Sequence, residues 1–166
     1  MRESKKEEIM KVVINVQHGG YSLSYLAVKR LAELNGKECY AYEHDHQNKE
    51  RPYKLITKVP KDCMWLSYFT TNDEDLVCRI TNSDKWNEMT QEEKDAYNKE
   101  YDKYDLDCRP EDRTDPKLIQ VIEELGKKAD GSCAKLKVVE IPDGIEWHIH
   151  EYDGYEHIAE NHRTWN

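Results

Sequence analysis

Apolar residues recur in short runs along the chain, and the spacing within each run predicts one secondary-structure element. Residues 11–16 (KVVINV) form a mostly β-branched run that is typical of a buried strand. Residues 17–21 (QHGGY) interrupt this run, and Ser22 or Ser24 can then cap a helix. Helical spacing predicts that this helix has a buried stripe made of Leu23, Leu26, Ala27, Leu31 and Leu34.

The first strand and this helix are followed by a second strand candidate at residues 38–42 (ECYAY). Asn35 and Gly36 end the helix between them. Two strands that are joined by a crossover helix in one sheet run parallel. The order of the elements therefore predicts a βαβ unit at the N-terminus.

The middle of the chain is polar and carries shorter apolar runs. Residues 53–59 and 64–70 are strand candidates. Thr90 and Glu93 match a capping box, which predicts a helix over residues 91–104. Three tyrosines at helical spacing give this charged helix an aromatic stripe: Tyr97, Tyr101 and Tyr104.

The last fifty residues are strongly patterned again. Asp115 followed by Pro116 predicts a helix start, and Gly126 predicts its end. The apolar face of this helix consists of Leu118, Ile119, Ile122 and Leu125. Residues 134–141 and 145–152 alternate between apolar and polar side chains, which predicts two strands.

Asp153-Gly154 predicts a two-residue hairpin turn after the second of these strands. The hairpin would place Tyr152 opposite Tyr155, Ile149 opposite Ile158, His150 opposite His157 and Glu151 opposite Glu156. The last pair sets two like charges against each other. A short helix over residues 156–162 is the alternative, and we favour the hairpin.

Together these patterns predict an α/β fold with a small mixed sheet, an N-terminal βαβ unit and a C-terminal β-meander. The 166 residues fit one domain. We expect residues 11–43 and 112–166 to form its frame and residues 44–111 to form a variable, partly helical insert.

The net charge of −9 is unevenly distributed. Residues 82–115 carry 12 acidic and 6 basic residues, and residues 140–166 carry 7 acidic residues and one arginine. This balance argues against direct DNA binding by the chain.

Aliphatic residues are sparse, so the eleven tyrosines and self-association are two ways to supplement the core. We expect a homo-oligomer.

Several classes of protein are disfavoured by composition. No stretch approaches the ~20 apolar residues that a membrane span needs, and the charged start MRESKKEEIM argues against a secretory signal. The five cysteines form no CxxC pair, which favours reduced thiols in an intracellular chain.

The glycine turn is the first candidate site. A glycine turn before a helix exposes backbone N–H groups that can bind an anion. The turn and its neighbours could hold a phosphate through His18, Gly19, Gly20, Tyr21, Ser22 and Ser24. A tight turn with a capping serine and no ligand is the alternative.

The C-terminal histidines are the second candidate site. Imidazoles with nearby carboxylates suit zinc or iron, and His148, His150 and His157 would be the ligands. No spacing matches a helical ligand motif such as HExxH. A solvated strand face is the favoured interpretation, so we expect no metal and no cofactor.

Rings and guanidinium groups in the last third of the chain form a third candidate. Trp147 or Trp165 could stack on a planar ligand, and Arg113 or Arg163 could neutralise its charge. The alternative is that Trp165 packs into the frame.

The acidic helix over residues 91–104 is a fourth candidate, either as a binding surface for a basic partner or as a solvated helix.

Three stretches resemble a family of small proteins encoded by tailed bacteriophages and prophages. They are KVVINVQHGGYSLSYLAVKRLAELNG, RTDPKLIQVIEELGKKADG and AKLKVVEIPDGIEWHIHEYDGYEHIAENHRTW. The resemblance covers about half of the chain and carries over no catalytic residue. It implies an accessory protein in the host cytoplasm that inhibits a host factor or sequesters a nucleotide signal of host defence.

Taken with the glycine turn, the resemblance implies a phage accessory binding protein of the counter-defence type, without turnover, that sequesters a small anionic, nucleotide-like ligand. An acidic, protein-binding inhibitor of a host factor is the alternative. A metal-dependent hydrolase that acts through the histidines is a further alternative.

Overall fold

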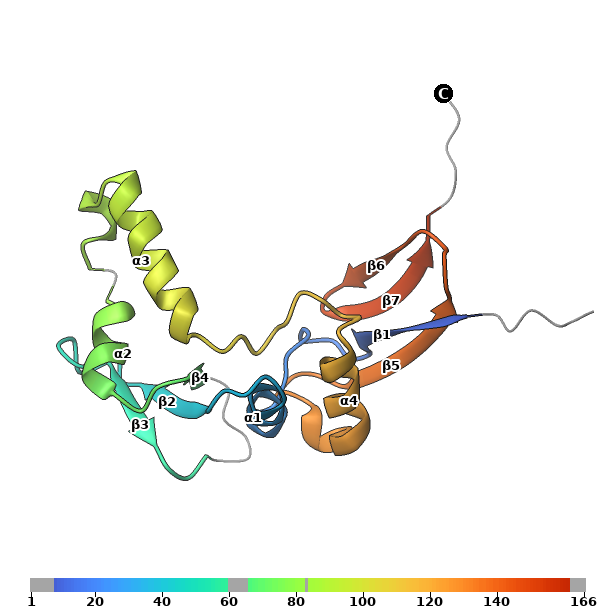
Figure 1. Ribbon diagram of the computed structural model, residues 1–166, viewed down its shortest axis with the longest axis horizontal. Coiled ribbons are helices and arrows are strands. Elements are labelled where there is room, and N and C mark those ends of the chain that lie inside the picture. The colour runs from blue at the N-terminus through green and yellow to red at the C-terminus, as the bar shows by residue number, and fades with distance from the viewer. Residues whose placement is uncertain (1–7, 60–65, 83, 162–166) are drawn as a thin grey trace, which may run out of the picture. The chain divides into compact units, whose positions relative to one another are not determined.

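A computed structural model describes residues 8–59, 66–82 and 84–161 of the chain (Figure 1). The chain divides into two compact units. The first unit consists of Met1–Ala27 and Arg109–Asn166, and the second consists of Val28–Cys108. The second unit therefore begins earlier than the insert expected from residue 44.

The first unit is built on two antiparallel strands from opposite ends of the chain. Strand β1 (Ile9–Asn15) pairs with β5 (Leu136–Pro142), and Val12 lies opposite Val139. Strands β6 (Trp147–Tyr152) and β7 (Tyr155–Glu160) form a separate antiparallel hairpin. All predicted cross-strand pairs of this hairpin are confirmed, and the alternative helix over residues 156–162 is not formed.

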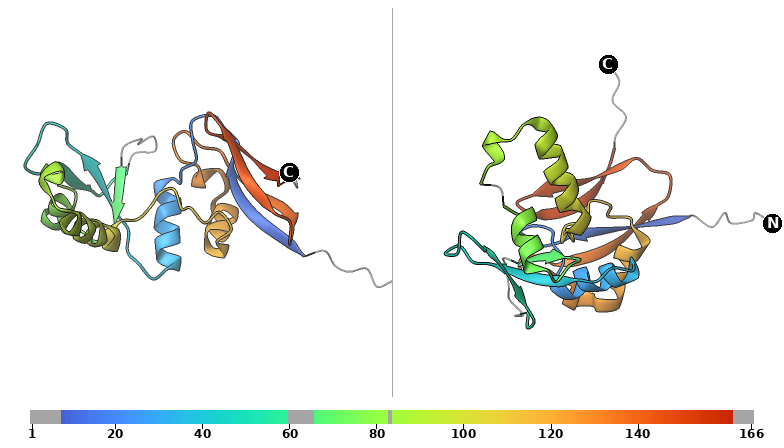
Figure 2. Two further views of the ribbon diagram at one scale, coloured as in Figure 1. Left: turned by 90° about the horizontal axis from the view of Figure 1, so that it is seen from above. Right: turned by 60° about the vertical axis from the view of Figure 1, so that its left-hand side comes forward.

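The hairpin and a helix cover opposite faces of the β1–β5 pair (Figures 1 and 2). On one face, Val12, Ile14 and Ile141 pack against apolar side chains of the hairpin. On the other face lies helix α4 (Pro116–Leu125), which is followed by the 3₁₀ helix η2 (Gly126–Ala129). Helix α4 has the predicted start at Asp115-Pro116, and its buried residues are Leu118, Val121 and Ile122.

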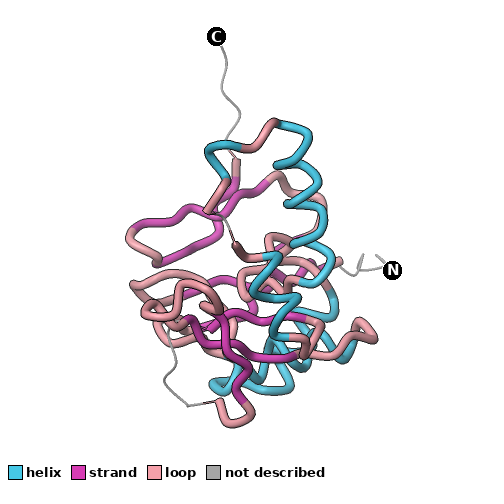
Figure 3. Tube along the Cα trace, turned by 90° about the vertical axis from the view of Figure 1, so that its left-hand side faces the viewer, coloured by secondary structure: helices cyan, strands magenta, loops and turns pink. Residues whose placement is uncertain are grey.

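The second unit holds a three-stranded antiparallel sheet with the order β3–β2–β4 (Figure 3, strands in magenta). The strands are β2 (Tyr40–His44), β3 (Tyr53–Ile56) and β4 (Leu66–Phe69). The helices are α1 (Tyr25–Leu34), which starts at the boundary between the units, α2 (Glu74–Ile80), the 3₁₀ helix η1 (Trp86–Glu88) and α3 (Gln91–Tyr104).

The core of this unit is mainly aromatic. Tyr42, Phe69, Val77 and Ile80 form its buried centre. Phe69 contacts Tyr42 and Tyr101 edge to face, with ring centroids 5.6 and 5.9 Å apart. Tyrosines therefore supplement the sparse aliphatic residues here, as the composition predicts.

The predicted class, a small α/β fold, is confirmed, but the predicted parallel pairing is wrong. Strands β1 and β2 lie in different sheets, and every strand pair described by the structure is antiparallel. The reason is that β1 finds its partner in β5, whose pattern of apolar residues matches its own. Strand β2 instead lies between β3 and β4 in the other unit.

The predicted apolar stripe of α1 is also partly wrong. Leu23 precedes the helix and pairs with Asp130, and Leu26 is 50% exposed. The buried residues of the helix are Ala27, Val28 and Ala32. The face that packs inward therefore runs through Ala27, Val28 and Ala32, and Leu26 lies outside it.

Candidate functional site

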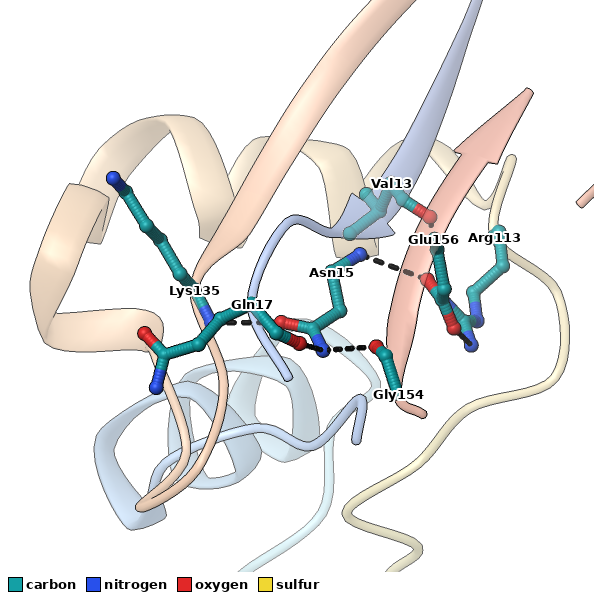
Figure 4. Close-up of polar contacts among 7 residues, drawn as sticks. All are labelled: Val13, Asn15, Gln17, Arg113, Lys135, Gly154 and Glu156. Atoms are coloured by element: carbon teal, nitrogen blue, oxygen red, sulfur yellow. Dashed lines mark hydrogen bonds and ion pairs between the residues drawn. The ribbon is translucent and has the colours of Figure 1, made fainter. Parts of the chain in front are cut away.

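Two polar residues are buried in the first unit, at the point where β1 ends and the hairpin turn approaches it (Figure 4). Asn15 is fully buried, and Glu156 is 6% exposed. We refer to them and their partner Arg113 as the polar cluster.

The carboxylate of Glu156 is the centre of this cluster. It accepts a hydrogen bond from the backbone N–H of Asn15 (2.8 Å) and two from the Arg113 guanidinium (3.0 and 3.1 Å). Arg113 also donates to the carbonyl oxygen of Val13 (3.3 Å), and its Cζ lies 3.1 Å from the centroid of the Tyr21 ring. The arginine expected to neutralise a ligand is therefore engaged with a carboxylate inside the fold.

The side chain of Asn15 connects three further segments. Its Nδ2 donates to the carbonyl oxygens of Gln17 (2.7 Å) and Gly154 (2.6 Å). Its Oδ1 accepts from the backbone N–H of Lys135 (2.8 Å). Buried polar groups need such partners, and here they join the end of β1 to the hairpin turn and to the start of β5.

The glycine turn packs against the hairpin turn. The N–H of Gly19 donates to the carbonyl oxygen of Asp153 (3.2 Å). A Cβ on Gly154 would lie 2.7 Å from the nitrogen of Gly19 and would also collide with the nitrogen of Gly20. At least one of the N–H groups expected to hold a phosphate is therefore used within the fold.

The serines after the turn also have structural partners. Ser24 caps α1: its Oγ accepts from the N–H of Ala27 (3.2 Å) and donates to the carbonyl oxygen of Lys128 (2.6 Å). The carbonyl oxygen of Ser22 accepts from the N–H of Gly131 (3.0 Å). The bridge between Leu23 and Asp130 lies between the glycine turn and the first residue of the helix, Tyr25.

His18 points to a surface beside this turn. Its ring lies 5.6 Å from that of Tyr155, centroid to centroid, and its Nδ1 lies 3.8 Å from a carboxylate oxygen of Asp153. The side chains of His18 and Asp153 are 65% and 80% exposed. An imidazole and a phenol ring are thus accessible together, next to a negative charge.

The remaining ring and guanidinium candidates do not meet at one described site. Trp147 is half-buried and packs on the β1–β5 core. Arg163 and Trp165 lie outside the described residues.

The solvent-facing side of the hairpin carries imidazole and phenol rings. We refer to this surface as the hairpin outer face; its exposed members are His148, His150, Tyr152, Tyr155 and His157. His150 and His157 lie directly opposite each other, with ring centroids 4.8 Å apart. Within residues 8–59, 66–82 and 84–161, no group of three or more metal-binding side chains is placed to hold an ion.

Helix α3 presents a different surface in the second unit. Tyr101 and Tyr104 pack against the aromatic core, and Tyr97 contacts Trp86. Burial raises the pKa of Tyr101 above the usual range of a phenol. Burial likewise raises the pKa of the carboxyl group of Asp105, which accepts a hydrogen bond from Tyr101. No side chain of α3 is fully buried, and the charged side is exposed.

The sequence pattern does not predict that Asn15 and Glu156 are buried together. One feature of the sequence does indicate burial of each residue. Asn15 is the single amide in an otherwise apolar run, and Glu156 falls on the same face of its strand as Ile158. A polar residue at an inward position implies a buried partner, but the chain does not show locally that the partner is Arg113.

No protein-family profile, curated protein or solved structure matches this chain. Among the described residues, no helix is both long enough and apolar enough to cross a membrane.

Proposed function

We propose that this chain is a phage accessory protein that binds a basic protein of the host and catalyses no reaction. The binding surface is the acidic segment, which we define as residues 84–108. It contains η1 and α3. The resemblance to phage-encoded proteins supplies the expected source and the host cytoplasm as the site of action.

The distribution of charge in the second unit carries this proposal. The unit has 18 acidic and 13 basic residues, and residues 28–81 contain nine of each. Its whole net charge of −5 therefore belongs to the acidic segment, with nine acidic and four basic residues. Charge concentrated on one surface attracts partners of opposite charge and speeds their encounter.

The packing of α3 supports the same conclusion. The tyrosine edge of the helix lies on the core, so the opposite edge faces solvent with Glu92, Asp95 and Asp102. The helix is held at its N-terminus and at Glu100, about one turn before its last residue. Its capping box is complete, and Arg79 from α2 holds Glu100 in a bidentate pair with distances of 2.9 and 3.1 Å. A surface fixed in this way loses little conformational entropy on binding.

The test is capture of host proteins from lysate by the tagged chain, followed by calorimetric titration of the purified captured protein. The variant E92Q/D95Q/D102Q removes three negative charges from the exposed edge of α3. The control E38Q/E43Q/E50Q removes three exposed negative charges from residues 28–81 of the same unit. We expect the first variant to weaken binding at least about tenfold, about 1.4 kcal/mol, and the control to bind like the wild type.

A small anionic, nucleotide-like ligand is the second candidate. The accessible rings of His18 and Tyr155 favour it, because a base can stack on exposed aromatic side chains. The use of Gly19 and Arg113 within the fold counts against it. Calorimetry against cyclic nucleotides and ADP-ribose compounds tests this candidate. Heat that disappears in H18A/Y155A supports it, and no heat with any compound excludes it.

A further inference from the structure

We propose that His150 and His157 form a two-imidazole chelate for a divalent cation of the zinc, nickel or copper type on the hairpin outer face. The proposal is independent of the acidic segment, which lies in the other unit. It rests on His150 and His157, which neither candidate function uses.

The geometry of the hairpin brings the two rings together. His150 and His157 are direct cross-strand partners in an antiparallel pair, with ring centroids 4.8 Å apart and ring planes inclined by 38°. Side chains at such positions have Cβ atoms roughly 5 Å apart. Imidazoles at this separation can turn one nitrogen each towards a common ion.

Both imidazoles are available to an ion. They are exposed on the strand face that points away from the β1–β5 core. Neither has a hydrogen-bond partner in the part of the chain that the structure describes, whereas His148 on the same face is bonded to Asn161. Imidazole nitrogen is a preferred ligand of zinc, nickel and copper ions.

The surrounding charge favours a cation. The hairpin itself, residues 147–160, carries four acidic residues and no lysine or arginine. The carboxylate of Glu156 is already neutralised by Arg113, but those of Glu151 and Asp153 are exposed beside the hairpin turn. With two protein ligands, the ion would keep water at its remaining positions, so this is an exchangeable site and not a closed structural one.

The experiment uses the intact chain and zinc chloride or nickel chloride in a buffer that does not bind metal. Calorimetry measures the affinity. In parallel, substoichiometric copper(II) is added to the labelled protein, and the loss of backbone amide signals locates the ion. Loss of groups that only orient a metal ligand costs about 10–100-fold in affinity. We therefore expect H150Q and H157Q each to weaken binding at least about tenfold.

Two control variants separate this site from other imidazoles. H148Q changes a neighbour on the same face, and H44Q/H46Q removes the other close imidazole pair, whose ring centroids lie 4.3 Å apart in the second unit. We expect both controls to keep the hairpin site, and copper to broaden the amides of β6 and β7 first. Absence of binding, affinity unchanged in both H150Q and H157Q, or broadening confined to other elements would overturn the proposal. The amide spectrum of each variant verifies its fold.

Discussion

Two arginine–glutamate pairs of the same bidentate geometry lie in very different surroundings. In the pair of Arg113 and Glu156 the side chains are 15% and 7% exposed, and in the pair of Arg79 and Glu100 they are 61% and 43% exposed. Water screens the second pair and hardly reaches the first. The two pairs have the same chemical groups and differ in burial, so a comparison of their contributions to stability isolates the effect of burial.

We expect Arg113→Ala to lower the free energy of unfolding by about 3–5 kcal/mol, because it leaves the buried carboxylate of Glu156 without its counter-charge. The matched change Arg79→Ala should cost much less, because water screens this exposed pair. Urea denaturation of the two variants measures both values. Equal effects of the two substitutions would show that the buried pair does not hold the first unit together.

Gly154 and Gly144 have nearly the same backbone conformation, with φ of +81° and +80°. A Cβ on Gly144 meets nothing within 4 Å, whereas one on Gly154 collides with the glycine turn. Gly144→Ala should therefore cost only the left-handed conformation, about 1–2 kcal/mol. Gly154→Ala should cost about 1–3 kcal/mol more. Thermal and urea unfolding measure the difference, and equal losses would mean that the two turns do not pack together.

At the scale of single elements, local patterns predicted most of the structure. The capping box at Thr90, the Asp115-Pro116 start and the Asp153-Gly154 turn act over a few residues, and each element is found where its pattern placed it. Pairing between β1 and β5 joins strands more than 120 residues apart. No local signal distinguishes that partner from the nearer β2, which is why the βαβ prediction failed.

The N-terminus of α3 offers a test at this scale. The hydroxyl of Thr90 accepts from the N–H of Glu93 (3.3 Å), and a carboxylate oxygen of Glu93 accepts from the N–H of Thr90 (2.8 Å). We expect Thr90→Ala to destabilise the second unit by about 1 kcal/mol. Urea denaturation followed by far-ultraviolet circular dichroism measures this loss. An unchanged transition would contradict the role of the cap.

The same cap predicts a dependence on pH. The hydrogen bonds from the backbone N–H and then the hydroxyl of Thr90 lower the pKa of Glu93 below its usual 4.5. A carboxyl group with a lowered pKa in the folded state stabilises the fold above pH 4.5, and this contribution is lost as the pH falls through the lowered pKa. Glu93→Gln keeps the cap without the titration. Its stability should therefore fall less between pH 6 and pH 3 than that of the wild type, as measured by urea denaturation; an identical decline would contradict this assignment.

At the scale of the whole molecule, the chain separates into two units with different surfaces. The first carries the polar cluster and the hairpin outer face, and the second carries the acidic segment. Charge counts along the sequence located the acidic segment correctly, because α3 keeps its charged side chains in solvent. Local sequence does not show what the glycine turn contacts in the folded chain. The N–H of Gly19 donates to a hairpin turn that lies more than 130 residues further along the chain.

Titration of the captured host protein decides whether the acidic segment is the binding surface. We expect E92Q/D95Q/D102Q to lose at least about tenfold in affinity relative to E38Q/E43Q/E50Q, with the difference shrinking as salt screens the charges. Equal affinities for the two variants, at low and at physiological salt, would contradict the claim.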